Sequence, residues 1–495
     1  MAEAPGQADP ARWAAWRTLV AVDEDEAYAN LVLPKLVSEA GLTGRDAALA
    51  TELGYGTLRA SGTVDEILRD CSSRPLADIE TGVLNLLRLG AYQLLKTRIP
   101  NHAAVATTVD LARATGNARA TGFVNAILRK VSARDFDAWC DRISREASPL
   151  GRLAVRHSHP GWIVGAFADA LGAGSARPPA SEVSAETAGL LYNGADGPDH
   201  DLSDLEAALS ADDERPETHL VAWPGRISRD ELVQQAAGEA GPYSPYAVRL
   251  VTGGEPAALA AVQEQLAGVQ DEGSQLCAVA LSQLPLSGPD ARWLDLCAGP
   301  GGKAALLAAL ADRRGARLTA SELHPHRAEL IARATAGWDV EIRVGDARRL
   351  ATDDGPASAG AEPAAGSNIV EAYDRVLLDA PCTGLGALRR RPEARWRKTP
   401  DDLADLVVLQ RDLLDAAARV VRPGGVIGYV TCSPHLAETR GQISRFLADR
   451  EDFELLDARP AFPGVTRLDD SGMVQLWPHR HGTDAMFFAA LRRTR

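Results

Sequence analysis

The stretch from Arg292 to Lys303, R-W-L-D-L-C-A-G-P-G-G-K, constrains the fold more than any other part of the chain. A short apolar run breaks into a glycine-rich turn and then into an Ala/Leu-rich segment, which is the pattern of a buried parallel strand, a ligand-binding loop and a helix. The three glycines allow a tight turn and a close approach of the backbone to a ligand. The free N–H groups at the start of the helix would face that ligand.

Two well-known nucleotide-binding loops fit this stretch badly. A phosphate-binding Walker loop needs glycine at 297 and serine or threonine at 304, but these positions hold Cys297 and Ala304. A dinucleotide fingerprint needs G-x-G-x-x-G, whereas the run here is G-P-G-G-K. A purely structural turn would have little reason to place three glycines at the carboxyl end of a strand.

Four further strands are predicted downstream, and each is followed by a polar or reactive residue. Their expected ranges are Arg317 to Ser321, Val340 to Val344, Tyr373 to Leu378 and Val426 to Val430. They lead into Glu322, Gly345-Asp346, Asp379-Ala380-Pro381-Cys382-Thr383-Gly384 and Thr431-Cys432-Ser433. Ligands of open parallel sheets bind outside the carboxyl ends of the strands, where an acidic residue after the second strand takes a ribose. The five strand ends therefore predict one site, with Glu322 at the ribose.

These motifs carry a family resemblance. C-A-G-P-G-G-K, D-A-P-C-T-G and T-C-S, in that order on successive strands, resemble the S-adenosylmethionine-dependent RNA cytosine-C5 methyltransferases of the Nop/Sun family, and within it the RsmB/Fmu/Sun type that modifies ribosomal RNA. The resemblance covers roughly residues 245 to 495. It implies a Rossmann-like class I methyltransferase domain over residues 246–495 and S-adenosylmethionine as the cofactor.

The N-terminal part is predicted to be an all-α helical bundle over residues 11–147, after a disordered tail over residues 1–10. The expected helices are Ala11 to Val22, Tyr28 to Ala40, Gly44 to Ser61, Thr63 to Cys71, Ile79 to Thr97, His102 to Thr115 and Ala118 to Val131. Stretches such as E-L-G-Y-G-T-L-R and G-F-V-N-A-I-L-R-K resemble the NusB-like RNA-binding domain of RsmB-type enzymes. Arg59, Arg88, Arg129 and Lys130 are candidate phosphate contacts there, with plain surface charge as the alternative.

The remaining segments have weaker patterns. Residues 148–245 are expected to form a linker and a small α/β accessory region, with an acidic stretch from about Asp199 to Glu217. The pair His157 and His159 is expected to be a surface or cap feature. Residues 351–369 lack large apolar side chains and predict a disordered insertion. Met473 to Trp477 and Ala485 to Leu491 predict a C-terminal hairpin.

Composition restricts the function classes. The chain has 495 residues, 45% of them hydrophobic, and neither an apolar run of membrane-spanning length nor a signal peptide, so a cytoplasmic protein without membrane contact is expected. Its six cysteines are scattered with no C-x-x-C pair, which predicts neither disulfides nor a metal site. The net charge of −14 argues against a wholly basic nucleic-acid surface.

One local run is strongly basic. R-R-R-P-E-A-R-W-R-K, from Arg389 to Lys398, directly follows the Cys382 loop. A charge run of this kind is usually a solvated loop, but its place in the sequence favours phosphate contact. Arg389, Arg390, Arg391 and Arg397 are therefore predicted to bind RNA.

The chemistry that the resemblance implies needs a cysteine nucleophile, because carbon 5 of cytosine must be activated by thiolate addition at carbon 6. By resemblance Cys432 is the nucleophile, Cys382 assists product release, and Asp379 contacts both the cofactor and the cytosine. The expected cofactor-binding residues are Cys297, Ala298, Gly299, Pro300, Gly301, Gly302, Lys303, Glu322, Arg327, Asp346 and Asp379.

The leading hypothesis is thus methylation of carbon 5 of a cytosine in 16S ribosomal RNA by a monomeric enzyme. The same chemistry on tRNA or another RNA is one alternative, because the motifs predict the reaction and not which RNA is methylated. A non-catalytic RNA-binding or antitermination factor is another. A degenerate scaffold, however, would have no reason to keep both cysteines, Asp379 and the glycine loop together.

Overall fold

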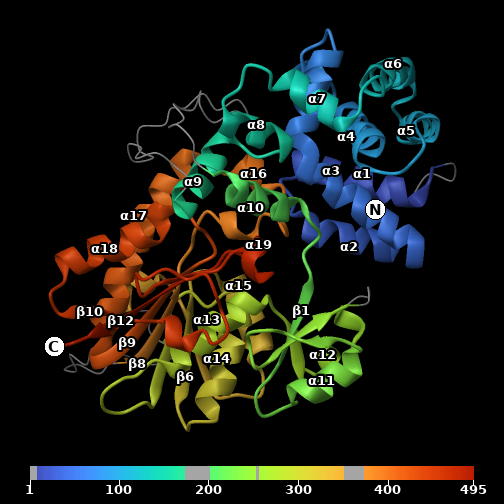
Figure 1. Cartoon of the computed structure of the whole chain (residues 1–495). Helices are drawn as coiled ribbons and strands as arrows, with labels where there is room; N and C mark the ends of the chain where they lie inside the picture. Colours follow the sequence, from blue (N-terminus) through green and yellow to red (C-terminus); the bar gives the residue numbers. More distant parts are fainter. Residues whose placement is uncertain (1–7, 173–200, 252–255, 351–372) are drawn as a thin grey trace. The chain divides into compact units, whose positions relative to one another are not determined.

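The computed structural model describes residues 8–172, 201–251, 256–350 and 373–495. Most of the tail, the expected 351–369 insertion and the Pro/Ala-rich linker after residue 172 lie outside them. The chain divides into two compact units, which Figure 1 shows in sequence colours. One unit comprises residues 1–215 with 388–400, and the other comprises residues 216–387 with 401–495. The N-terminal unit therefore extends to residue 215, and the basic run belongs with it.

The N-terminal unit is α-helical, which confirms the fold class predicted for it. Its helices are α1 (Pro10–Glu24), α2 (Ala29–Glu39), α3 (Gly44–Cys71), α4 (Thr81–Lys96), α5 (Asn101–Ala114), α6 (Thr121–Val131), α7 (Phe136–Ile143), α8 (Pro149–Arg156), α9 (Gly161–Leu171), α10 (Ser203–Asp213) and α16 (Ala394–Arg397). Helix α1 begins where the Asp9 side chain accepts the Arg12 N–H and Pro10 occupies the first turn, which is a favourable helix start. Leucine, valine and alanine side chains of α1, α3, α4 and α6 form the core.

Helix α3 differs from the sequence-based expectation of two helices separated at Gly62. It runs unbroken through that glycine, and the Trp396 ring lies over the position. A Cβ at Gly62 would lie 2.1 Å from the Trp396 ring, and one at Gly56 would lie 2.1 Å from the Tyr92 hydroxyl. Each glycine permits close packing of an aromatic side chain against a continuous helix, so neither marks its end.

The second unit contains two sheets. A small antiparallel sheet has the order β2-β3-β1-β4, made of β1 (Thr218–Ala222), β2 (Glu239–Ala240), β3 (Ala247–Leu250) and β4 (Ala267–Val269), with helices α11 (Arg229–Ala236) and α12 (Ala260–Gln263). Strands β1 and β2 and helix α11 lie within residues 148–245, the range expected for the accessory region, whereas β3, α12 and β4 lie beyond it. Helix α13 (Glu272–Gln283) follows, and it starts where Asp271 caps the Gly273 N–H.

The large sheet is mixed and has the order β10-β12-β9-β8-β5-β6-β7, with β11 paired to β12. Its strands are β5 (Arg292–Asp295), β6 (Arg317–Glu322), β7 (Val340–Val344), β8 (Tyr373–Asp379), β9 (Val421–Thr431), β10 (Phe453–Leu456), β11 (Val474–Gln475) and β12 (Phe487–Arg493). Helices α14 (Gly302–Asp312), α15 (Pro325–Ala334), α17 (Pro400–Val420), α18 (Arg440–Asp449) and α19 (Pro478–His481) connect them. The Rossmann-like prediction is confirmed.

The strand directions in this sheet position the site. Strands β5 to β9 pair in parallel, whereas β12 is antiparallel to both β9 and β10. The chain leaves β5 towards β6 on one side and returns to β8 on the other, so a topological switch point lies between β5 and β8. Such a point opens a crevice at the carboxyl ends of the strands. The C-terminal hairpin is also confirmed by the pairing of β11 with β12.

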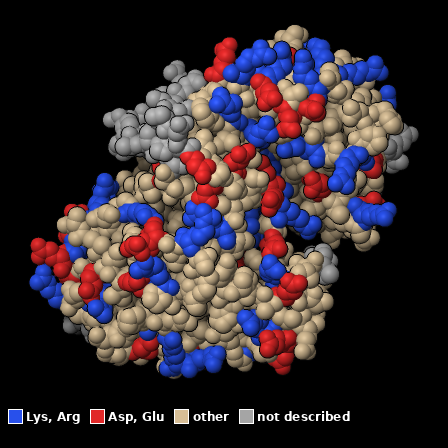
Figure 2. All heavy atoms as spheres, in the orientation of Figure 1, with Lys and Arg blue, Asp and Glu red and all other residues tan. Residues whose placement is uncertain are grey.

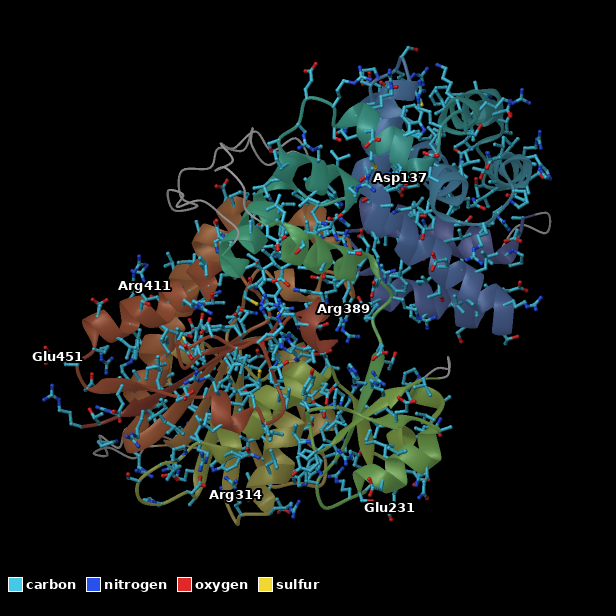
Figure 3. The ribbon with its side chains drawn as sticks, viewed as in Figure 1. Asp137, Glu231, Arg314, Arg389, Arg411 and Glu451 are labelled. Atoms are coloured by element: carbon cyan, nitrogen blue, oxygen red, sulfur yellow. The ribbon has the colours of Figure 1, made fainter. Side chains whose placement is uncertain are left out.

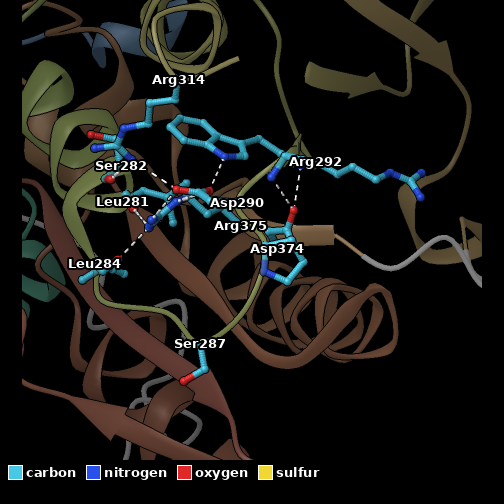
Figure 4. Close-up of polar contacts among 12 residues, drawn as sticks. Leu281, Ser282, Leu284, Ser287, Asp290, Arg292, Arg314, Asp374 and Arg375 are labelled. Carbon is cyan, nitrogen blue, oxygen red and sulfur yellow. Dashed lines mark hydrogen bonds and ion pairs between the residues drawn. The ribbon is translucent and has the colours of Figure 1, made fainter. Parts of the chain in front are cut away.

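The amino ends of β5 and β8 are fastened by a polar network that lies away from this crevice (Figure 4). Arg375 pairs with Asp290 at 2.8 Å and donates to two carbonyls at the end of α13. Asp374 accepts the backbone N–H groups of Ala291 and Arg292 at 2.7 Å each. These contacts fix the register of β5 and β8 at their amino ends, which lie opposite the carboxyl ends where the site is predicted.

Candidate active site

The glycine loop is held by two side chains from β6 and α15. The Gly299 N–H donates to Glu322 Oε2 at 3.1 Å, and Arg327 Nη2 donates to the Gly299 carbonyl at 2.6 Å. Arg327 also pairs with Glu322 at 3.6 Å. The buried Glu322 carboxylate accepts the His324 N–H with its other oxygen. Each of its oxygens keeps a lone pair for a ligand hydroxyl.

The glycines of this loop have different roles. A Cβ at Gly299 would lie 2.1 Å from Glu322 Oε2, and one at Gly301, whose φ is 114°, would lie 2.9 Å from Ala334. These two glycines are therefore required by packing and backbone conformation within the protein. At Gly302 the nearest atom would be Gln270 Nε2 at 3.8 Å, so open space remains at the first turn of α14. Of the three glycines, Gly302 best fits a close approach to a ligand.

Lys303 and Asp379 form an ion pair between the loop and the end of β8. Lys303 Nζ lies 2.9 Å from Asp379 Oδ2, and the two side chains are 12% and 28% exposed. Burial disfavours the charge of Lys303, but the Asp379 carboxylate outweighs this effect and raises the pKa of Lys303. The lysine therefore stays a cation in a largely dry site. The sequence predicts Lys303 only as a cofactor contact, because its partner Asp379 is 76 positions away in the chain.

Asp295, at the end of β5, is a further buried acid that sequence analysis missed. Neither of its carboxylate oxygens has a hydrogen-bond partner of good geometry among the described residues. Burial, reinforced by the nearby Asp379 charge, raises the pKa of Asp295 to about 8. The signal was present in the sequence as an acidic residue within the apolar run that forms β5.

The two predicted catalytic cysteines meet. The Sγ atoms of Cys382 and Cys432 lie 3.4 Å apart, and both residues are partly exposed, unlike the buried Cys71, Cys140 and Cys277. A hydrogen bond from Cys382 lowers the pKa of Cys432, and the Lys303 ammonium acts in the same direction. The same contact raises the pKa of Cys382. Cys432 is therefore the thiol that ionises more readily.

Asp346 follows β7 at the same edge of the sheet, as expected. Its carboxylate is bound by its own neighbour, since Arg348 Nη2 lies 2.7 Å from Asp346 Oδ2. This hydrogen bond lowers the pKa of Asp346 and keeps the group anionic.

Of the residues near the start of α13, Asp271 acts as the helix cap, and its Oδ1 also accepts the Asp484 N–H at 3.1 Å.

The basic run is packed into the N-terminal unit. Arg395 is fully buried and donates to the carbonyls of Arg59 and Asp212 and to Asp213 Oδ1 at 2.7 to 3.1 Å. Burial and the nearby Arg395 charge lower the pKa of Arg59, which in turn donates to the Arg389 carbonyl. Arg389 itself is buried, whereas Arg411 and Glu451 of the other unit extend into solvent (Figure 3).

The four arginines predicted to bind RNA thus have different surroundings. Arg397 Nη2 donates to the carbonyls of Val22 and Ala27 at 2.7 and 2.8 Å. Arg391 is exposed and lies 5.8 Å from the Tyr28 ring. Arg390 is half-buried. Arg391 has the most solvent-accessible position of the set, so it is the best placed for a phosphate.

The other basic candidates of the helical unit are mostly engaged by its own groups. Arg88 pairs with Asp23 and Asp65, and Lys130 Nζ donates to the Cys71 carbonyl. Arg129 lines a groove of about 430 Å³ together with His102 and Arg113. On the face drawn in Figure 2, basic and acidic side chains alternate over both units.

Two expectations on metals and membranes can be compared with the described residues. His157 and His159 are buried, with His159 lying 3.5 Å from Asp212, so a surface position was wrong, whereas His157 is the C-cap of α8, as the cap alternative predicts. Within the described ranges no group of three or more His, Cys, Asp or Glu side chains could hold a metal ion. None of the helices described is both long and apolar enough to cross a membrane.

Comparisons with known proteins agree with this geometry. Residues 284–492 match the family described as 16S rRNA methyltransferase RsmB/F, and residues 9–133 match the NusB family. A putative methyltransferase of Mycobacterium tuberculosis (strain H37Rv) is 49% identical over 98% of this chain and 97% of its own. A probable ribosomal RNA small subunit methyltransferase B of Bacillus subtilis is 31% identical over 97% and 98%. The crystal structure of PH0851 has the same fold, with a TM-score of 0.74 at 19% identity over 98% and 99% of the two chains.

Proposed function

Because the chain belongs to the RsmB/F family of 16S rRNA methyltransferases, we propose that it methylates carbon 5 of a cytosine in 16S ribosomal RNA through a covalent cysteine–cytosine intermediate. The protein is an S-adenosylmethionine-dependent RNA methyltransferase. The proposal of a carbon 5 target and a covalent intermediate rests on the pair of thiols, Cys382 and Cys432, which lie 3.4 Å apart beside the Lys303–Asp379 ion pair. Methyl transfer to an already nucleophilic nitrogen or oxygen atom would need no thiol pair.

The cofactor is expected at the glycine loop. When bound, S-adenosylmethionine supplies an electrophilic methyl group on a sulfonium. The open space at Gly302 and the free N–H groups at the start of α14 suit its methionine carboxylate, and the buried Glu322 suits the ribose hydroxyls. Asp346 is assigned to the adenine end. Arg327 supports the loop through the Gly299 carbonyl and Glu322, and it need not touch the ligand.

Cys432 is assigned as the nucleophile. Its thiolate adds to carbon 6 of the cytosine, so that an S–C6 bond forms and carbon 5 gains enamine character. Carbon 5 could then take the methyl group that the cofactor supplies, which would leave the cofactor sulfur as a neutral thioether. Cys432 suits this step because the hydrogen bond from Cys382 and the charge of Lys303 favour its thiolate.

Asp379 and Cys382 are assigned to the proton transfers. Asp379 lies at the end of β8, where its carboxylate, whose charge Lys303 balances, can accept a hydrogen bond from the amino group of the cytosine. In its protonated form it can donate one to ring nitrogen 3. Release requires that a base take the carbon 5 proton, whose bonding electrons form the C5–C6 double bond while the S–C6 bond breaks, which regenerates the Cys432 thiolate and the aromatic ring. Cys382 lies next to this sulfur and is assigned to assist the release.

The test is a map of 5-methylcytosine by bisulfite sequencing of total RNA from cells with and without the protein. We expect one cytosine of 16S ribosomal RNA to lose its methyl group when the protein is absent. Loss of a mark on tRNA or another RNA would keep the chemistry and change the substrate, and unchanged methylation everywhere would contradict the proposal. A 16S substrate would place the protein in the cytoplasm, where we propose that it acts as a monomer.

A further inference from the structure

Glu438 is a fully buried acid next to the two cysteine loops, and the mechanism above does not use it. Its Oε1 accepts the Thr383 N–H at 2.8 Å and Gln410 Nε2 at 3.0 Å. Its Oε2 accepts the Thr383 hydroxyl. Among the described residues it has no cationic partner, so its charge is met by neutral donors alone. Burying a carboxylate in this way is costly, which makes a role beyond packing worth testing.

The groups around Glu438 hold it in one orientation. The Tyr429 hydroxyl donates to the Glu438 carbonyl at 2.8 Å. Gln410 Nε2 donates to the Pro381 carbonyl at 2.9 Å as well as to the carboxylate, and Gln442 Nε2 lies 3.3 Å from Gln410 Oε1. Glu438 is therefore fixed to β9 through Tyr429 and to α17 through Gln410, and Gln410 also binds Pro381, which directly precedes Cys382.

Thr383 links this carboxylate to the second cysteine loop. Thr383 directly follows Cys382, and its Oγ1 lies 3.2 Å from the Oγ of Ser433, which directly follows Cys432. Because a carboxylate only accepts, the Thr383 hydroxyl must donate to Glu438, so that Ser433 donates to Thr383. The Ser433 oxygen is then free to accept the His435 N–H at 3.2 Å. One acid thus sets the direction of a hydrogen-bond chain across both loops.

We propose that Glu438 is a positioning residue for the methyl transfer. Through Thr383 and Ser433 it holds the Cys382 and Cys432 loops in register, so that the Cys382 thiol stays directed at the Cys432 sulfur. This inference rests on the proposed function for its consequences in catalysis. Neither cysteine lies within a strand, since each follows the end of β8 or β9, and a thiol is a weak donor that needs preorganised geometry.

The first experiment measures the apparent pKa of the Cys432 thiol in the absence of RNA and cofactor. Cys432 in the full-length protein is alkylated with iodoacetamide over a range of pH, and its labelled peptide is quantified by mass spectrometry. We expect Glu438→Ala to raise the apparent pKa of Cys432 by about one unit, which is a tenfold lower thiolate fraction below that pKa. Glu438→Gln should restore most of the profile, because its amide can accept the Thr383 N–H and donate to Thr383 Oγ1. Thr383→Val should reproduce the effect of Glu438→Ala.

Asp374→Asn is the matched control. Like Glu438, Asp374 is a buried acid that accepts backbone N–H groups. It lies at the amino end of β8, away from the two cysteines (Figure 4). This variant should lower the unfolding temperature and leave the Cys432 profile unchanged. If Glu438→Ala or Thr383→Val lowers stability and leaves the profile unchanged too, Glu438 has a structural role only and the proposal is wrong. Should Glu438→Ala fail to fold, Thr383→Val and Ser433→Ala decide the question in the same way.

The second experiment tests whether the hydrogen bonds from Glu438 through Thr383 to Ser433 affect catalysis. Single-turnover methylation of the natural RNA should fall about tenfold in Glu438→Ala, with the affinities for RNA and S-adenosylmethionine nearly unchanged, because the lost contact acts on the reacting sulfur. Glu438→Gln should recover most of the rate. An equal loss in both variants would contradict positioning through Thr383. If the wild-type protein makes no 5-methylcytosine, the proposed function fails. The alkylation profile would still test whether Glu438 positions the two cysteines.

Discussion

Cys382 Sγ and Cys432 Sγ lie 3.4 Å apart at the ends of two neighbouring parallel strands, β8 and β9. The two residues are 50 positions apart in the sequence. Their contact makes the two thiols chemically unequal, because a proton shared between them lowers the pKa of Cys432 and raises that of Cys382. This inequality underlies the division of labour that we propose for them.

The first prediction concerns the cofactor. Glu322→Ala removes the group assigned to the ribose and also one support of the glycine loop. Each hydrogen bond to a charged acceptor contributes roughly 1.5 to 3 kcal/mol, so affinity for S-adenosylmethionine should fall at least about tenfold. Isothermal titration calorimetry measures this. Glu329→Ala is the control, because Glu329 is exposed on α15 and pairs only weakly with Arg333. Unchanged affinity in Glu322→Ala would contradict the assignment.

The second prediction concerns RNA. Arg391 is exposed, so Arg391→Ala should weaken RNA binding and flatten its logarithmic salt dependence by about 0.7 to 0.9 if one phosphate contact is lost. Filter binding at several salt concentrations measures the slope. Arg411→Ala serves as the control, since Arg411 is an exposed arginine that follows no predicted RNA motif. An unaltered slope in Arg391→Ala would make Arg391 an ordinary surface charge.

The third prediction separates Arg395 from that group. Arg395 is fully buried and paired with Asp213, so Arg395→Ala leaves an acid and several carbonyls without their donor. Breaking a buried pair in this way should lower the free energy of unfolding of the helical unit by roughly 3 to 5 kcal/mol. Arg113→Ala, which removes an exposed pair with Asp110, should change it by less than about 0.5 kcal/mol. Chemical denaturation compares the two, and similar losses would refute a structural role for Arg395.

The fourth prediction concerns pH. The folded protein holds the pKa of Asp295 at about 8, well above its value in the unfolded chain, so the native state retains a proton that the unfolded state has lost. Stability from this group is therefore present at low pH and is lost as the pH rises from about 4 to about 8. Asp295→Asn mimics the protonated acid and removes this loss. Its unfolding temperature relative to wild type should rise between pH 5 and pH 8, and a constant difference would contradict the assignment.

The parallel strands and their functional ends were predictable from the sequence because each is a local signal. An apolar run followed by glycine or a polar residue needs no knowledge of the rest of the chain, and Glu322, Asp379, Cys382 and Cys432 all belong to such runs. The sheet then brings them together through a rule of topology that holds for parallel strands in general.

What could not be predicted depends on partners far apart in the sequence. Glu438 sits in an unremarkable polar turn, and its partner Thr383 is 55 positions away. Gly62 resembles a helix break until Trp396 is placed over it. The basic run resembles a solvated loop, yet Arg395 is neutralised by Asp213 and by backbone carbonyls of the helical unit. Charge patterns alone do not show which side chains find such partners.

The fifth prediction tests the central claim, that Cys432 attacks the cytosine and Cys382 assists its release. Each cysteine is changed to alanine, and the purified protein is incubated with unmethylated 16S ribosomal RNA and S-adenosylmethionine and then run on a denaturing gel. Cys382→Ala should accumulate a protein–RNA adduct, because the Cys432 thiolate still adds to carbon 6 while release is slowed. Cys432→Ala should form neither adduct nor 5-methylcytosine. An adduct that accumulates in Cys432→Ala, and not in Cys382→Ala, would contradict the account and reverse the two roles.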